Sequence, residues 1–183
     1  MTRQIIIIGF MGTGKSTVGR ALALKLNHRM VDLDELITTN EDRSPAEIIE
    51  QDGENHFRRI ETEKLGEVLA EGAARVVAVG GGAWTVTENR RLISEHGAFA
   101  VWLDAPFELC WKRIDAGQQV RPLARSRELA EKLYHERQGS YALADARVTI
   151  VENDSVDEIA TKIVRELLPQ DYSYADKSES KVF

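Results

Sequence analysis

Near its amino terminus the chain reads Ile5-Ile6-Ile7-Ile8-Gly9-Phe10-Met11-Gly12-Thr13-Gly14-Lys15-Ser16-Thr17, which joins a β-branched run to the pattern Gly-x-x-x-x-Gly-Lys-Ser. A continuous apolar run of this kind is typical of a strand buried on both faces. After Lys15 the apolar residues follow helical spacing. A strand, a glycine loop and a helix in this order form the context that a phosphate-binding P-loop requires.

The residue types in this loop indicate how it would bind phosphate. Glycine has no Cβ, so backbone N–H groups can surround the anion, and the start of the next helix directs its positive dipole end toward it. Lys15 would supply a charge for the outer phosphates, and Ser16 a hydroxyl ligand for Mg²⁺. The alternative is a glycine turn between a core strand and a core helix. The predicted nucleotide contacts are Gly12, Thr13, Gly14, Lys15, Ser16 and Thr17.

Composition limits the classes of protein to consider. The chain has 183 residues, 43% of them apolar and 30% charged, as expected for one soluble globular domain. A formal net charge of -6 argues against nucleic-acid binding. The single Cys110 excludes an internal disulfide and suits a reducing compartment. Without a membrane-length apolar run or a signal-peptide pattern, we expect a cytoplasmic, monomeric protein.

Apolar runs alternate with helical patterns, which predicts βα units wound into a parallel sheet. We predict strands at 4–8, 29–31, 76–79, 99–103 and 147–151. Helices are predicted at 15–26, from 35, from 45 to a stop at Gly53, at 55–71, from a Thr87 cap to 97, at 106–114, at 127–144, and from 155 to 168. Capping boxes, Ser44–Glu47 and Ser155–Glu158, begin the third and the last of them. Residues 1–168 would form one domain, 115–126 a mobile loop, and 169–183 a disordered tail.

Ligands bind where parallel strands end, and an acidic pair falls at this edge. Asp32 and Asp34 follow the second strand, so both carboxylates can face one side. Beside a P-loop they could hold Mg²⁺ through water and accept a proton from a substrate hydroxyl. The alternative is a helix N-cap and a solvated partner. Asp104 also ends a strand, but Asp104-Ala105-Pro106 is typical of a helix entry, and we assign it no metal role.

Other candidates are less specific. Arg58 and Glu61 lie one helical turn apart, which could form a fork for an anion or an ordinary surface ion pair. Gly80, Gly81 and Gly82 would let a ligand approach the backbone, or would form a flexible loop. Arg121 and Arg137 could neutralise phosphoryl charge or be solvated, and spacing alone does not decide between these roles.

Taken together, these motifs resemble those of shikimate kinase, a small P-loop kinase related to the nucleoside monophosphate kinases. The resemblance covers residues 4–168. It rests on the P-loop, Asp32-x-Asp34, the run Gly53-Glu54-Asn55-His56-Phe57-Arg58-Arg59-Ile60-Glu61, Gly80-Gly81-Gly82-Ala83, Val120-Arg121-Pro122-Leu123, and Glu136-Arg137 with Tyr141. A P-loop alone is common to many enzymes, whereas this set in this order is highly specific.

The resemblance implies transfer of the ATP γ-phosphoryl group to the 3-hydroxyl of shikimate, in chorismate biosynthesis. It implies a three-layer α/β/α fold with strand order 2-3-1-4-5, a substrate-binding segment at 33–61 and a lid at 115–126. Asp34 would bind and activate the substrate hydroxyl. Arg58, Arg137 and Gly80–Gly82 would hold the shikimate carboxylate. Lys15 and Arg121 would stabilise the transferred group. Ser16 and, through water, Asp32 would bind Mg²⁺. Arg113 would pack on adenine.

Some positions depart from the family pattern. Gly139 and Ser140 replace a common Pro-Leu pair, Ala124 replaces a Leu, and Trp84 could be core or could reshape the pocket. Residues 152–155 lack a basic residue that some members place near adenine. Two other functions stay open at this point: a related kinase for a polyol acid such as gluconate, and a non-catalytic relative that retains the fold.

Overall fold

Five parallel strands form the central sheet of the computed structural model, which describes residues 3–117 and 122–167. Their order is β2-β3-β1-β4-β5, as predicted. The strands are β1 Ile5–Ile8, β2 Met30–Asp32, β3 Val76–Ala78, β4 Phe99–Asp104 and β5 Ala146–Thr149. In the centre of the sheet, Ile5 of β1 is paired with Val76 of β3 on one side and Phe99 of β4 on the other.

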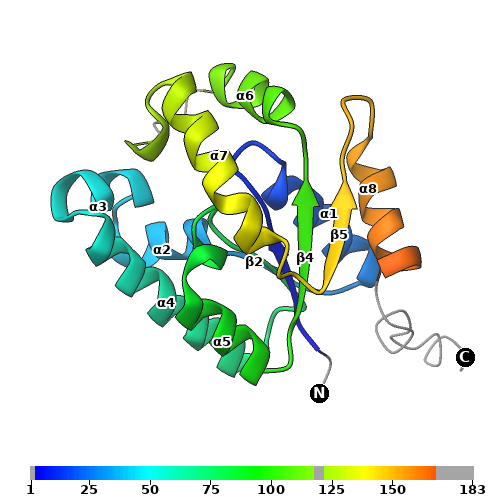
Figure 1. Cartoon of the computed structure of the whole chain (residues 1–183). Helices are drawn as coiled ribbons and strands as arrows, with labels where there is room; N and C mark the ends of the chain where they lie inside the picture. Colours follow the sequence, from blue (N-terminus) through cyan, green and yellow to red (C-terminus); the bar gives the residue numbers. More distant parts are fainter. Residues whose placement is uncertain (1–2, 118–121, 168–183) are drawn as a thin grey trace, which may run out of the picture.

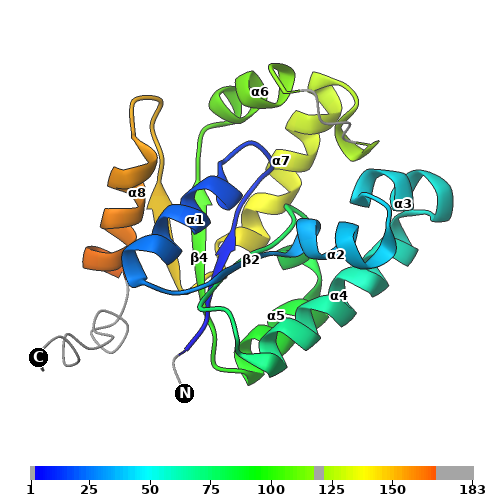
Figure 2. The same ribbon diagram turned by 180° about the vertical axis from the view of Figure 1, so that it is seen from behind.

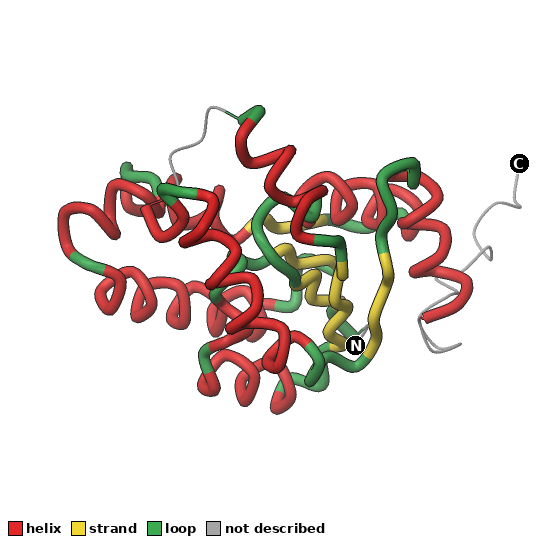
Figure 3. Tube along the Cα trace, turned by 45° about the horizontal axis from the view of Figure 1, so that its top comes forward, coloured by secondary structure: helices red, strands yellow, loops and turns green. Residues whose placement is uncertain are grey.

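Helices cover both faces of this sheet and extend beyond one edge. Their bounds are α1 Lys15–Leu26, α2 Leu33–Glu41, α3 Pro45–Asp52, α4 Glu54–Glu71, α5 Thr87–Glu95, α6 Phe107–Asp115, α7 Arg127–Tyr141 and α8 Val156–Lys162. Helices α1 and α8 pack together on one face (Figure 2), and α5 and α7 lie on the other (Figure 1). Helices α2, α3 and α4 form an arm beside the β2 edge (Figure 1). Figure 3 shows the strands enclosed between helices, which is the predicted three-layer fold.

The core is built on β1. All four isoleucines of β1 are fully buried, because helices cover both sides of the central strand. Leu22 of α1 and Leu65 of α4 are equally inaccessible. Burying a side chain of this size contributes about 1.5–3 kcal/mol relative to leaving it exposed. The buried strand β1 therefore fixes the position where the P-loop begins.

Two helices begin with the predicted capping boxes. Ser44 accepts a hydrogen bond from the amide of Glu47 at 3.3 Å, and its own amide donates to the Glu47 carboxylate at 2.7 Å. Ser155 and Glu158 repeat the arrangement at 3.2 and 2.9 Å. Each cap typically contributes about 1 kcal/mol.

Two predicted helix starts were wrong. Helix α2 begins at Leu33 rather than near residue 35, because the Asp32 carboxylate accepts from the amides of Asp34 (3.1 Å) and Glu35 (3.4 Å). Thr87 is not the cap of α5 but its first residue, and Val86 occupies the N-cap position without a side-chain hydrogen bond.

The final strand and two helix ends also differ from expectation. Strand β5 ends at Thr149, since the Asp154 carboxylate accepts from the amide of Val151 at 2.8 Å and draws the chain into a turn. Helix α7 ends at Tyr141, where short-range bonds such as Leu143 N–H to the Ser140 carbonyl close its last turn. Helix α8 gives way to a π-helical turn, Ile163–Leu167. Residue 168 and the predicted tail lie outside the described residues.

Candidate active site

A cavity of about 1070 Å³ opens at the carboxyl edge of the sheet. Segments that are far apart in the sequence line it: the P-loop, the Asp32–Asp34 turn, the start of α3, one face of α4, and the loop after β3. Arg113 and Arg137 complete the wall, together with Pro122 and Leu123 from the short 3₁₀ helix Pro122–Ala124. The predicted groups therefore converge on one space large enough for two small reactants.

The P-loop has the backbone shape that a phosphate cradle needs. Gly12 has φ +80°, and a Cβ added there would lie 2.6 Å from the carbonyl oxygen of Cys110. Gly14, the N-cap of α1, has φ +92° and no side-chain cap. The first amides of α1 are therefore directed at the cavity without a protein side chain to receive them, which favours an anion.

Three side chains contact carbonyl groups of this loop. Lys15 Nζ donates to the carbonyl of Phe10 at 3.0 Å, and Thr13 Oγ1 donates to the same oxygen at 2.9 Å. Arg113 Nη1 donates to the carbonyl of Gly12 at 3.1 Å. Lys15 and Arg113 thus bring two positive charges to the loop. A contact between Arg113 and adenine stays a prediction.

The acidic pair lines the same cavity as the P-loop. Asp32 and Asp34 both line the cavity, and Asp32 also caps α2, so the capping and site interpretations apply to the same residue. The Ser16 hydroxyl and the Asp32 carboxylate are hard oxygen donors of the kind that Mg²⁺ prefers. Within residues 3–117 and 122–167, no cluster of three His, Cys, Asp or Glu residues could hold a metal ion alone. The donor set fits Mg²⁺, which usually keeps water and substrate phosphate as its other ligands.

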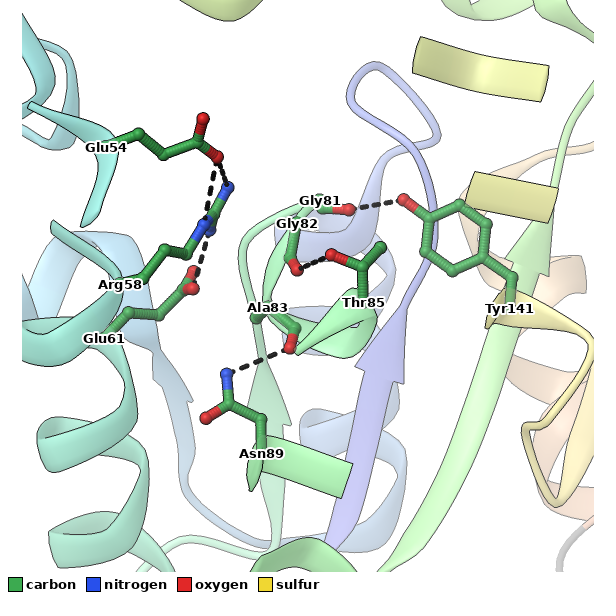
Figure 4. Close-up of polar contacts among 9 residues, drawn as sticks. All are labelled: Glu54, Arg58, Glu61, Gly81, Gly82, Ala83, Thr85, Asn89 and Tyr141. Atoms are coloured by element: carbon green, nitrogen blue, oxygen red, sulfur yellow. Dashed lines mark hydrogen bonds and ion pairs between the residues drawn. The ribbon is translucent and has the colours of Figure 1, made fainter. Parts of the chain in front are cut away.

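On the other side of the cavity, α4 presents a buried ion pair. Arg58 Nη1 lies 2.6 Å from Glu61 Oε2, and Arg58 Nη2 lies 3.0 Å from Glu54 Oε1 (Figure 4). The Glu61 side chain is 0% exposed and that of Arg58 17%, so this is not the surface pair that spacing alone allowed. Burial raises the pKa of Glu61, and the Arg58 charge offsets that effect only in part. The guanidinium also packs 5.2 Å from the centroid of the Phe57 ring.

The glycine loop after β3 packs directly against these side chains. A Cβ on Gly80 would lie 2.7 Å from Glu61 Oε1, and one on Gly82 would clash with the Arg58 guanidinium, 2.7 Å from its Cζ. A Cβ on Gly81 would lie 3.6 Å from Arg137 Nη1. None of the three has positive φ. Glycine is needed here because side chains of the protein itself approach the loop backbone closely. The approach of a ligand to this backbone stays a prediction.

Arg137 is a buried cation at the same place. It is 7% exposed, it lines the cavity, and its charge acts to lower the pKa of the neighbouring Glu61 against the effect of burial. Arg58 lines the same cavity, so two guanidinium groups whose shape and charge match a carboxylate face one space. Helix α7 continues through Gly139, so the departure from the family pattern does not displace Arg137 from the cavity wall.

The remaining residues named from the sequence lie outside the cavity wall or outside the described residues. Trp84 and Ala124 are core residues, each 5% exposed, and neither lines the cavity. Asp104 accepts from Arg147 Nε at 2.9 Å and also lies outside the cavity wall. Arg121 lies outside the described residues. Cys110 is buried and packs in the core.

Sequence reasoning missed Glu54 as a second partner of Arg58. The signal was available, since residues four apart on a helix are neighbours. The contact of Tyr141 with the glycine loop was also missed. The Tyr141 hydroxyl donates to the carbonyl of Gly81, a pairing across 60 residues that helical or strand spacing does not predict (Figure 4).

Comparisons with known proteins agree with this geometry. The family model described as shikimate kinase matches residues 11–168. A shikimate kinase of Geobacter sulfurreducens is 42% identical over 88% of this chain and 88% of its own length. One from Sulfurihydrogenibium sp. is 37% identical over 89% of this chain and 99% of its own.

A solved structure gives the same picture. The shikimate kinase from Acinetobacter baumannii in complex with shikimate superposes with a TM-score of 0.81 at 31% identity, covering 89% of this chain and 91% of that one. The chain described here therefore belongs to the shikimate kinase family.

Proposed function

We propose that this protein transfers the γ-phosphoryl group of ATP to the 3-hydroxyl of shikimate, producing shikimate 3-phosphate and ADP. The main observation is that one cavity holds a phosphate cradle on one side and two positively charged guanidinium groups on the other, with Asp34 also in its wall. Family membership and the shikimate-bound relative support the choice of substrate.

The substrate side would bind the shikimate carboxylate. Arg58 and Arg137 offer guanidinium groups that match a carboxylate, and the glycine loop brings its backbone close to both. Holding the carboxylate here would place the ring hydroxyls toward Asp34. The Asp34 carboxylate would orient the reacting hydroxyl and accept its proton.

The phosphate side would hold ATP. Its phosphates would bind the P-loop amides, with Lys15 beside the transferred group. The hydroxyl oxygen would form a bond to the γ-phosphorus while the bond from this phosphorus to the bridging oxygen breaks, and ADP leaves. Ser16 and Asp32 would hold Mg²⁺, which neutralises phosphate charge when bound. We also assign Arg121 a charge-stabilising role and Arg113 a contact with adenine.

The two alternatives are not favoured. The family is that of shikimate kinases rather than of kinases for other polyol acids. A non-catalytic relative would be expected to lose part of the machinery, yet Lys15, Asp34 and Arg58 are all present in the cavity wall.

A substrate panel tests the proposal. The purified protein is incubated with ATP and Mg²⁺ together with shikimate, with gluconate, or without an acceptor, and ADP release is measured. We expect release with shikimate only, and its loss when EDTA removes Mg²⁺. Turnover of gluconate alone would support the other kinase, and nucleotide binding without any turnover would support a non-catalytic protein.

We further propose that the protein is a cytoplasmic monomer that binds neither nucleic acid nor membranes. Its net charge of -6 and single cysteine support this. Within the described residues, no helix is both long and apolar enough to cross a bilayer. Light scattering during size-exclusion chromatography would measure the oligomeric state.

A further inference from the structure

The glycine loop and the 3₁₀ helix that follows it, Ala83–Thr85, are held by side chains, a feature that the reaction above does not use. Four successive carbonyl groups each accept a hydrogen bond from a different side chain. These bonds run from Tyr141 Oη to Gly81, from Thr85 Oγ1 to Gly82 at 2.7 Å, from Asn89 Nδ2 to Ala83 at 2.9 Å, and from Arg90 Nη1 to Trp84 at 2.6 Å (Figure 4 shows the first three). The orientation of this loop is therefore imposed by its surroundings.

Two hydrogen bonds link the loop reciprocally to the end of α7. The Tyr141 hydroxyl donates from the helix to the carbonyl of Gly81, and Trp84 Nε1 donates from the loop side to the carbonyl of Ser140 at 2.8 Å. Both rings are buried, at 0% and 5% exposure, and Tyr141 packs against Trp102 with ring centroids 5.9 Å apart. Buried aromatic side chains of this kind have little rotational freedom, so the link is stiff.

The Tyr141 bond also sets the direction of a backbone donor. The carbonyl of Gly81 and the N–H of Gly82 belong to one trans peptide and point in opposite directions. Because the carbonyl points to Tyr141, this N–H points to the opposite side of the loop, where Arg58 lies (Figure 4). Arg137 lies near the same hydroxyl, where its positive charge opposes the effect of burial on the pKa of Tyr141. One group thus bonds to the glycine loop and lies near Arg137, which are two of the elements proposed to bind the substrate carboxylate.

We propose that Tyr141 is a positioning residue for the carboxylate of the substrate, and that Trp84 supports it by tying the glycine loop to α7. The inference rests on the proposed function and adds residues that do not touch the substrate. Burial raises the pKa of Tyr141 to about 12, so the hydroxyl keeps its proton under assay conditions. Trp84, which departs from the family pattern, therefore helps to support the site.

The substitution Tyr141→Phe tests this, because it removes only the hydroxyl. We expect the KM for shikimate to rise about three- to tenfold, the range for losing one ordinary hydrogen bond. The kcat and the KM for ATP should stay within about twofold. The matched control is Tyr134→Phe on the same helix, whose hydroxyl donates to the carbonyl of Ala105 at 3.0 Å and which should leave both KM values unchanged.

A neutral analogue separates positioning from general loosening of the structure. Shikimate methyl ester lacks the carboxylate charge, so its inhibition constant should be the same for wild type and Tyr141→Phe. Trp84→Phe removes the second link while keeping an aromatic ring. It should raise the KM for shikimate by a smaller factor, and it provides the same comparison if Tyr141→Phe does not fold.

An unchanged KM for shikimate in the folded variants would overturn the inference. So would equal losses for the acid and its ester, or parallel rises in both KM values. A wild-type protein that does not phosphorylate shikimate would instead remove the proposed function, and the inference with it.

Discussion

The two sides of the cavity are built in different ways. The phosphate side is one continuous segment, 9–17, whose backbone amides form the site, with Lys15 and Arg113 bonded to its carbonyl groups. The carboxylate side is assembled from α4, the glycine loop and α7, and its charges lie on buried side chains. The first site is defined by local geometry, whereas the second exists only after these three segments have packed together.

This difference has an energetic consequence. Backbone amides at a helix terminus need no buried charge to attract phosphate. The carboxylate side instead buries Glu61 completely in order to hold Arg58, and burial raises the pKa of that carboxyl. We therefore expect substitutions on the carboxylate side to change stability as well as activity, and those on the phosphate side to change nucleotide use alone.

The largest effect should come from Asp34, in the wall shared by the two sides. In Asp34→Asn the side chain keeps its size but cannot accept the hydroxyl proton, so kcat should fall about 10²- to 10⁴-fold. Thermal unfolding should change little. Steady-state kinetics with a melting curve would measure both.

Asp157→Asn is the matched control for that variant, because Asp157 lies on α8 with its side chain 77% exposed, paired with Lys25. It should leave kcat unchanged. Full turnover in Asp34→Asn would show that the catalytic assignment of Asp34 is wrong.

The second-largest effect tests whether breaking the Arg58–Glu61 pair on the carboxylate side lowers the free energy of unfolding. Arg58→Gln should raise the KM for shikimate about 100-fold and lower the free energy of unfolding by about 3 kcal/mol, since Glu61 then stays buried without its partner. Denaturant titrations at pH 5 and pH 8 would measure the loss.

The pH dependence follows from the raised pKa of Glu61. A carboxyl whose folded pKa lies above its unfolded value favours the folded state at low pH and loses that stability as pH rises through the folded pKa. Removing Arg58 takes away the charge that lowers this pKa, so Arg58→Gln should be more destabilised at pH 8 than at pH 5. Adding Glu61→Gln should restore most of the stability and flatten the pH dependence without restoring the KM. If Arg58 and Glu61 behaved as a surface pair, Arg58→Gln would show no such pH dependence, and adding Glu61→Gln would not restore stability.

A smaller effect should follow from adding one methyl group to the glycine loop. In Gly82→Ala the new Cβ would displace the Arg58 guanidinium, which the present geometry places 2.7 Å away at Cζ. The KM for shikimate should rise roughly tenfold, because a shift of about 1 Å misaligns the fork. Gly139→Ala, where a Cβ meets nothing within 4 Å, is the control and should behave as wild type.

The smallest effect should appear on the phosphate side. Arg113→Ala removes an exposed side chain that donates to the carbonyl of Gly12. The KM for ATP should rise about threefold, as for loss of one modest hydrogen bond, while the KM for shikimate stays constant. A change in the shikimate KM instead would contradict the division of the cavity into two sides.

The same difference explains what could be predicted from sequence. The P-loop and the parallel sheet of βα units follow from local patterns, whereas the strand order was implied by the family resemblance. The structure has the predicted sheet and strand order, with the glycine loop between β1 and α1. Asp32 was predicted either to serve the site or to cap the following helix, and in the structure the same residue lines the cavity and caps α2.

The carboxylate side could not be derived from spacing. Arg58 and Glu61 have the separation of an ordinary surface pair, and only the approach of the loop after β3 buries them. The resemblance to the family supplied that assignment before the fold did. The bond from Tyr141 to Gly81 joins a helix end to a loop, and no periodic pattern encodes such a contact.

The most direct measurement for this account is a structure of the protein with shikimate and ADP bound. We predict that the shikimate carboxylate contacts the guanidinium groups of Arg58 and Arg137, and that a ring hydroxyl lies beside Asp34 and faces the P-loop. A carboxylate bound at the P-loop, or a ligand that leaves Arg137 without an anionic partner, would contradict it.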